Sequence, residues 1–152
     1  MIDLHCHLDG SIRETTLKEL YHGELPKISF YPNMGITEAL ESFKITLSVM
    51  QTLDNVTRIT HELCEDLELI GTNRSEIRFA PQLHCEGKIE KVIDAAICGL
   101  KPRHNLILCG LYGESPEVLK SLVKAAKTRS RVVGIDLAAA PLESHQWGMM
   151  DY

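Results

Sequence analysis

Two histidines near the start of the chain, His5 and His7, have a type and spacing that chemistry can use. Successive side chains of a β-strand point to opposite faces, so residues two positions apart share a face. On a strand, both imidazoles would project in one direction and could bind one zinc ion. The other interpretation is an ordinary pair of polar side chains near a strand end, because a catalytic zinc usually has three protein ligands and this motif supplies two.

The residues after the two histidines predict that the strand is followed by a turn and a helix. Asp9 and Gly10 suit a turn, and Ser11 with Glu14 three residues later has the spacing of a helix capping box. The histidines would then lie at the carboxyl end of the strand. That end carries the active sites of α/β barrels and of open parallel sheets.

The composition is that of a globular protein, with 44% hydrophobic and 24% charged residues in a chain of 152. A net charge of −5 and the absence of a basic stripe argue against a nucleic-acid partner. No run of about 18 apolar residues predicts a membrane span. No leader is expected, because Asp3 and His5 interrupt any apolar start. Five scattered cysteines without a CxxC motif predict reduced thiols and a cytoplasmic protein.

Hydrophobic periodicity predicts strands that alternate with helices along the chain. The apolar run at 105–109 is typical of a strand that is covered on both faces. Alternation of this kind predicts right-handed crossovers and a parallel sheet. The expected strands are residues 2–8, 76–80, 105–109 and 131–137, and the expected helices are 13–21, 37–50, 53–70, 89–98 and 115–130.

Several segments carry a family likeness. The run His5-Cys6-His7-Leu8-Asp9-Gly10-Ser11 resembles the opening of the adenosine deaminase family, which belongs to the metal-dependent amidohydrolases. Further resemblances follow in the family's order and span nearly the whole chain. They are Phe43, Arg58-Ile59 with Glu62, Glu76-Ile77-Arg78-Phe79-Ala80-Pro81, and Gly134-Ile135-Asp136-Leu137-Ala138.

The resemblance implies an α/β fold, the TIM (β/α)8 barrel, of which this chain supplies the first four strands. Such a barrel needs about 250 residues, so residues 1–152 would form the N-terminal half of one barrel domain. The family's third histidine ligand and its proton donor belong to later strands, and no catalytic residue is expected here. The expected partner is the C-terminal half of the barrel, as a second polypeptide or a missing segment, because open sheet edges are unstable in water.

The resemblance also implies roles for individual residues. His5 and His7 would bind Zn²⁺, and Asp9 would hold a ribose hydroxyl. Leu40 and Phe43 would lie in an apolar lid over the substrate. Without the resemblance, Asp9 is equally a turn-forming residue, which is common before glycine.

Three further positions are assigned in the same way. Arg78 would be a structural residue near the site, in an ion pair, because a guanidinium inside a barrel must be paired. Asp136 matches the family's fourth-strand aspartate; the alternative is a carboxylate satisfied by backbone donors. Ala139 stands where the family has a glycine against the purine, so that its methyl group could crowd the base.

The implied function is zinc-dependent hydrolytic removal of the 6-amino group of a purine nucleoside or base, once the missing half is present. Two alternatives stay open. One is another amidohydrolase activity on the same scaffold, because fold and metal do not fix the substrate. The other is a non-catalytic half-barrel that acts only in interaction.

Overall fold

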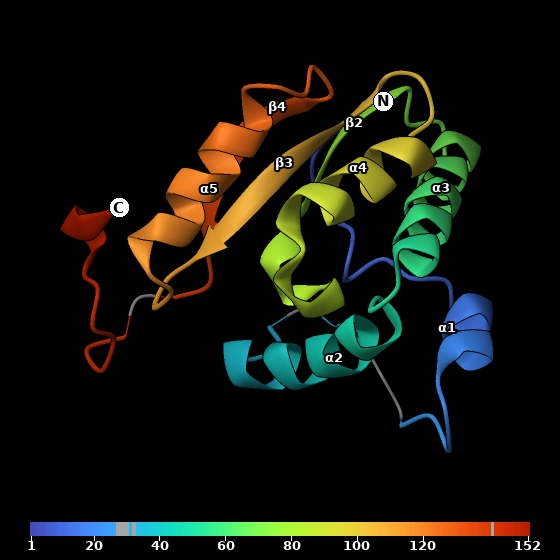
Figure 1. Ribbon diagram of the computed structural model, residues 1–152. Coiled ribbons are helices and arrows are strands. Elements are labelled where there is room, and N and C mark those ends of the chain that lie inside the picture. The colour runs from blue at the N-terminus through green and yellow to red at the C-terminus, as the bar shows by residue number, and fades with distance from the viewer. Residues whose placement is uncertain (27–30, 32, 141) are drawn as a thin grey trace.

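Four parallel strands form one sheet in the computed structural model of the chain (Figure 1). The structure describes residues 1–26, 31, 33–140 and 142–152, and the side chains of 36–41 are outside that description. The sheet order is β1-β2-β3-β4, so strands that follow each other in sequence are neighbours in space. The strands are β1 (Ile2–His7), β2 (Arg74–Phe79), β3 (His104–Leu111) and β4 (Val132–Ala138).

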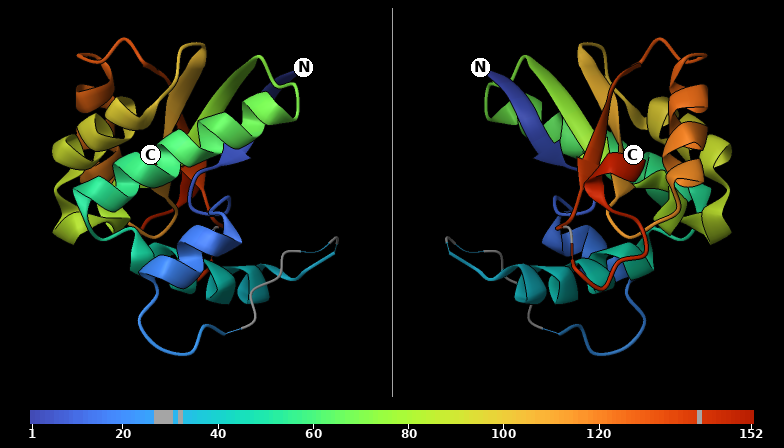
Figure 2. Two further views of the ribbon diagram at one scale, coloured as in Figure 1. Left: turned by 90° about the vertical axis from the view of Figure 1, so that its right-hand side faces the viewer. Right: turned by 90° about the vertical axis from the view of Figure 1, so that its left-hand side faces the viewer.

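Helices connect the strands, as the alternating pattern predicts. Helices α3, α4 and α5 lie on one side of the sheet, and α1 and α2 lie near the end at which the strands finish (Figures 1 and 2). The α-helices are α1 (Glu14–Leu20), α2 (Ile36–Val49), α3 (Leu53–Leu69), α4 (Ile89–Gly99) and α5 (Pro116–Ala126). Short 3₁₀ turns occupy Pro81–Leu83, Cys85–Gly87 and Met149–Asp151, in segments expected to be loops.

The core lies between the sheet and the helices α3, α4 and α5. Its strand side chains alternate, because every second residue of β2 and β3 faces the helices. Helix residues at intervals of three and four complete it. The members include Ile77, Phe79, Leu106 and Leu108 from the strands and Val56, Ile59, Val92, Ile93, Ala96 and Leu122 from the helices, all at most 1% exposed.

Ser11 and Thr37 do not stand at the cap positions of α1 and α2, whereas Ser115 stands at the cap position of α5. Ser11 does not cap α1: its backbone N–H donates to Leu8 in the turn, and its hydroxyl lies 3.7 Å from the sulfur of Cys6. The helix α2 begins after Gly35, so Thr37 lies within the helix and not at its cap position. Ser115 caps α5 by accepting a hydrogen bond from the N–H of Glu117.

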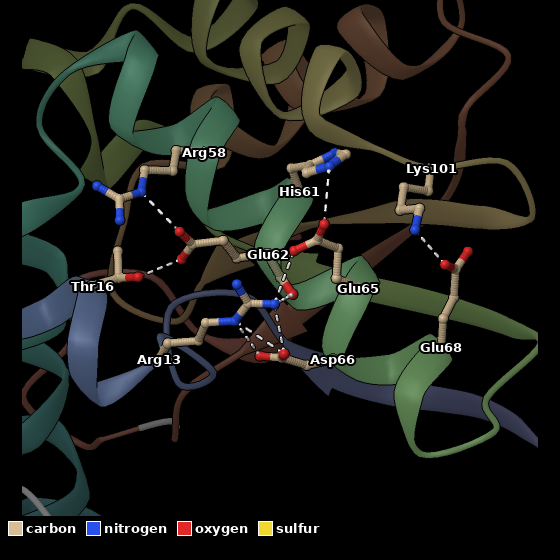
Figure 3. A network of polar contacts seen from close by, with 9 residues as sticks. All are labelled: Arg13, Thr16, Arg58, His61, Glu62, Glu65, Asp66, Glu68 and Lys101. Carbon is tan, nitrogen blue, oxygen red and sulfur yellow. Dashed lines mark hydrogen bonds and ion pairs between the residues drawn. The ribbon is translucent and has the colours of Figure 1, made fainter.

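Arg13 anchors the first helix to α3, in the contact network of Figure 3. Its Nε donates to both carboxylate oxygens of Asp66, at 3.0 and 2.9 Å, and its Nη2 donates to Glu65 at 3.0 Å. The Thr16 hydroxyl donates to Glu62 at 2.6 Å. Glu62 is therefore not the surface residue that its helical position suggests. These bonds fix the turn after β1, which carries the candidate site.

One further position differs from the sequence expectation. His104 is the first residue of β3 and is 1% exposed, whereas the expected strand begins at residue 105. The structure buries it because its Nδ1 forms a hydrogen bond of 2.8 Å with the hydroxyl of Ser75 on β2. Among the described residues, none of the helices has the length and apolar character needed to span a membrane.

Candidate functional site

The histidine pair lies at the carboxyl end of β1. The ring centroids of His5 and His7 are 5.3 Å apart and the rings are tilted by 45°. The register of β1 against β2 shifts between Asp3 and Cys6, so the strand is not regular where the pair begins. His7 is in register with Arg78 of β2. The irregular strand nevertheless keeps the two imidazoles side by side, as their spacing predicts.

The surroundings of His7 favour the neutral form of its imidazole. Burial lowers the pKa of His7, and the positive charges of His5 and Arg78 lower it further, against an opposing effect of Asp136. A neutral imidazole keeps a lone pair for a metal ion. The electrostatics of the strand end therefore suit a metal ligand.

Asp9 follows two residues later and is buried. It is 7% exposed, and among the residues that the structure describes its Oδ1 has no hydrogen-bond partner. The Nδ1 of His7 lies 3.9 Å from this oxygen. Burial raises the pKa of Asp9 to about 6, although backbone hydrogen bonds from Asp9 and Gly10 act in the opposite direction. An orphaned carboxyl oxygen is costly when it stays unpaired. This atom is thus suited to a donor group on a ligand.

A cavity of about 150 Å³ opens beside these residues. It combines a few polar groups with a mostly apolar wall, which is the composition of small-molecule sites. The wall comes from the carboxyl ends of all four strands, the loops after them and α2. It is lined by His7, Asp9, Phe43, Leu47, Phe79, Ala80, Leu83, Cys109, Leu111, Ala138 and Ala139.

The structure brings together most of the residues that the sequence assigns to a site. His7, Asp9, Phe43 and Ala139 line the cavity. His5 is absent from the lining but lies beside His7. The prediction for Leu40 falls on a side chain outside the described residues.

Gly10 allows Phe43 to pack close to the turn. A Cβ on Gly10 would lie 3.2 Å from the Cε1 of Phe43, closer than most real contacts. The ring of Phe43 packs over this turn, with its centroid 6.3 Å from that of His7. The turn glycine is therefore needed for close approach and not only for the bend.

Arg78 forms the ion pair that was predicted for it. Its Nη1 lies 2.7 Å from the Oδ2 of Asp136, and its Nη2 donates to the carbonyl of Leu4 at 2.9 Å. One side chain of β2 thus joins β1 to β4. The alternative for Asp136, a carboxylate satisfied by backbone donors, is not what the structure shows.

Ala139 departs from the usual backbone conformation. Its φ is +65°, in the left-handed region. An L-residue with a Cβ pays roughly 1–2 kcal/mol for that region, and glycine does not. The position at which the family glycine is replaced is therefore the position at which glycine would fit without strain.

Cys109 is a site residue that the sequence reasoning missed. It lines the cavity, is 2% exposed, and its thiol lies 3.9 Å from the Oδ2 of Asp136. Burial and then the nearby Asp136 raise the pKa of Cys109 to about 12, so the thiol stays protonated. The sequence does contain a signal that could have identified Cys109: it lies near the carboxyl end of an apolar strand.

The donor set fits a zinc ion in part. Two imidazoles are ligands that zinc prefers, and catalytic zinc sites usually take three protein ligands. Among the residues that the structure describes, no three His, Cys, Asp or Glu side chains gather in a way that could hold a metal. His5 and His7 would therefore supply two ligands to a zinc ion, and a catalytic site would take its third from other residues.

Comparison with known proteins places these features in a family. The adenosine deaminase family model matches residues 1–150. An adenosine deaminase of Clostridium botulinum is 36% identical, with 91% of this chain and 48% of that protein covered. One from Clostridium acetobutylicum is 35% identical, with coverage of 90% and 48%.

A solved structure agrees with this assignment. The N6-methyl-AMP deaminase of Arabidopsis thaliana is 26% identical with a TM-score of 0.75, and 93% of this chain and 49% of that chain are covered. The chain spans about half the length of the curated relatives it matches. The predicted α/β fold is confirmed, and the four-stranded sheet fits half of a deaminase barrel. The chain belongs to the adenosine deaminase family.

Proposed function

We propose that this chain is the N-terminal half of a zinc-dependent hydrolytic deaminase that acts on the 6-amino group of a purine nucleoside or base. In the reaction, water supplies the new 6-oxo oxygen and the amino group leaves as ammonia. The observation that carries the proposal is the His5 and His7 pair beside a cavity that Asp9 and Ala139 help to line. Related deaminases named for adenosine and for N6-methyl-AMP support this substrate class.

His5 and His7 would hold the zinc ion, and bound zinc supplies an activated water. The lowered pKa of His7 favours the neutral ring that ligation requires. Asp9 would accept a hydrogen bond from a ribose hydroxyl through its unpartnered Oδ1. This contact would supply the hydrogen bond that the buried carboxyl group lacks.

Phe43 and Leu40 would cover the base as an apolar lid carried by α2. The position of Phe43 in the cavity wall supports its part in this role. Ala139 would face the base at the end of β4. Arg78 and Asp136 would hold the strands and would not take part in the chemistry.

The remaining ligands and the catalytic acid would come from the C-terminal half of the barrel. This half would be a second polypeptide or a further segment, with residues 1–152 as the N-terminal half of one domain. The relatives' double length supports this. A cytoplasmic location is part of the proposal and is supported by five free cysteines.

A second candidate is an amidohydrolase that acts on another amino-purine or C–N bond. The observation in its favour is that Ala139 lines the cavity at the position where the family resemblance implies a glycine. This candidate keeps the same metal ligands. Turnover of adenosine against other amino-purines separates it from the first.

The experiment is to purify the chain together with its C-terminal half and to measure intact masses under denaturing conditions, zinc content and deamination. We expect two polypeptides, bound zinc and ammonia release. His7→Ala should remove zinc and activity while the complex persists, and His22→Ala, at an exposed histidine, should change neither. A complex that binds no zinc and deaminates no purine would contradict the proposal and favour an interaction role.

A further inference from the structure

One glutamine side chain binds the backbone on two sides of the cavity. The Nε2 of Gln51 donates a hydrogen bond of 2.8 Å to the carbonyl of Leu47 on α2. It donates another, of 3.1 Å, to the carbonyl of Leu83 in the segment after β2 (residues 80–87). Leu47 and Leu83 both line the cavity. Gln51 therefore joins two parts of the cavity wall that are far apart in sequence.

The oxygen of the same amide fixes its orientation. The Oε1 of Gln51 accepts a hydrogen bond of 3.0 Å from the backbone N–H of Cys85. A backbone carbonyl can only accept and a backbone N–H can only donate, so the partners of Gln51 admit one orientation of its amide. A glutamate at this position would keep the acceptor and lose the donor that binds both carbonyls.

The segment that Gln51 binds has an unfavourable backbone conformation. Cys85 and Glu86 have φ values of +49° and +58°, in the left-handed region that residues with a Cβ seldom adopt. Such a conformation persists only where the surrounding contacts hold it. The hydrogen bond from Cys85 to Gln51 is one of these contacts.

His84 makes a second connection between this segment and α2. It is 0% exposed, and its Nδ1 donates at 3.2 Å to the carbonyl of Met50, the C-cap residue of α2. The last carbonyls of a helix have no partners within the helix, so side chains such as His84 and Gln51 satisfy them. Gln51 is exposed, in contrast to His84. Without the Gln51 hydrogen bonds, α2 would stay attached through His84, but its distance from Leu83 would no longer be fixed.

We propose that Gln51 is a positioning residue that sets the distance between α2 and the segment after β2, and thereby the fit of the purine between Leu47 and Leu83. The inference rests on the proposed function and adds a residue to it. Gln51 acts through side chains that line the cavity. Phe43 and Leu47 lie four residues apart on α2 and share a face of the helix, so a shift of this helix end would move both against the base.

The first test compares the deamination kinetics of the wild type and Gln51→Glu, in the protein that contains this chain and its C-terminal half. We expect KM to rise about 10-fold, because the loosened wall weakens binding of the substrate and of the transition state equally, while kcat stays within about two-fold. A role in folding alone would reduce the amount of active enzyme, so the apparent kcat would fall at an unchanged KM. That result, or an unchanged KM and kcat, would overturn the inference.

Two further variants separate the hydrogen bonds from the added charge. Gln51→Ala removes the amide without a charge and should also raise KM about 10-fold. The matched control is Gln146→Glu, which makes the same change at an exposed glutamine in the segment after β4. It should leave KM and kcat unchanged. A rise of KM in Gln146→Glu as large as in Gln51→Glu would overturn the inference.

Hydrogen exchange tests the contact itself without turnover. In Gln51→Ala the amide of Cys85 loses its acceptor and should exchange on the order of 10-fold faster than in the wild type. Peptides from the carboxyl end of α2 should exchange faster too. If the wild type deaminates no purine, the proposed function fails, and the substrate role of Gln51 fails with it. If the wild type is active and the exchange of Cys85 is unchanged in the variant, this inference alone fails.

Discussion

The two interior strands and the two edge strands of the sheet have different physical roles. β2 and β3 bury most of their residues against the helices and against each other. β1 and β4 leave apolar side chains such as Ile2 and Val133 open. The edge strand β1 carries the histidine pair, and the strained Ala139 directly follows β4. The buried side chains that stabilise the fold are therefore mainly those of the two central strands. The histidine pair and Ala139 lie at the two edge strands.

This division explains how half of a barrel can be folded and incomplete. The helices α3, α4 and α5 cover one face of the central strands in this chain (Figure 2). Under the proposed function, the remaining zinc ligands would come from outside the described residues. Arg78 is the exception, because it ties both edge strands to the centre through Leu4 and Asp136.

The largest expected effect comes from truncating a central side chain. Leu106→Ala on β3, where Leu106 is 0% exposed, should lower the free energy of unfolding by about 3 kcal/mol. Val133→Ala on β4 should lower it by less than half of that at low protein concentration. Urea denaturation measures both. Equal losses at the two positions would break the contrast between centre and edge. A Val133→Ala loss that grows with protein concentration would show that another chain covers the edge.

A second prediction concerns acid sensitivity in the segment after β2. His84 is 0% exposed, its ring lies 5.8 Å from that of Phe79, and burial lowers its pKa to about 4. The unfolded chain binds this proton below about pH 6.5 and the folded chain only below about 4, so stability falls as the pH drops through that window. The contribution lost between pH 7.5 and pH 5 should be about 2 kcal/mol.

The measurement is the urea midpoint of the wild type and of His84→Gln at both pH values. Between pH 7.5 and pH 5, His84→Gln should lose about 2 kcal/mol less of its free energy of unfolding than the wild type loses. His22→Gln, at an exposed histidine, should follow the wild type. An unchanged pH dependence in His84→Gln would place the acid sensitivity elsewhere, for example at the edge.

The smallest expected effect is a gain in stability at the end of β4. Ala139→Gly should stabilise the chain by about 0.5 kcal/mol, because relief of the positive φ outweighs the extra freedom of glycine in the unfolded state. The neighbouring Ala138→Gly should instead destabilise by about 0.5–1 kcal/mol, because Ala138 lies within the strand. Melting temperatures of the two variants test this. Loss of stability in both would mean that Ala139 is not strained.

Much of the fold and part of the site could be predicted from local sequence. Apolar runs and helical periods located all four strands and five helices, because they reflect which face each element buries. The strand spacing of His5 and His7 also predicted that the two rings lie together. Caps were less predictable: Ser11 and Thr37 have suitable side chains, but the chain begins its helices elsewhere.

The sequence by itself determined the alternation of elements, the histidine pair and the turn that holds Asp9, because each of these depends on neighbours in the chain. Only the tertiary structure decided that Cys109 lines the cavity, that Arg78 pairs with Asp136 and that Ala139 is strained. These features depend on register between strands that are far apart in sequence. A one-residue change of register would turn their side chains to the other face of the sheet, and no local pattern fixes that register.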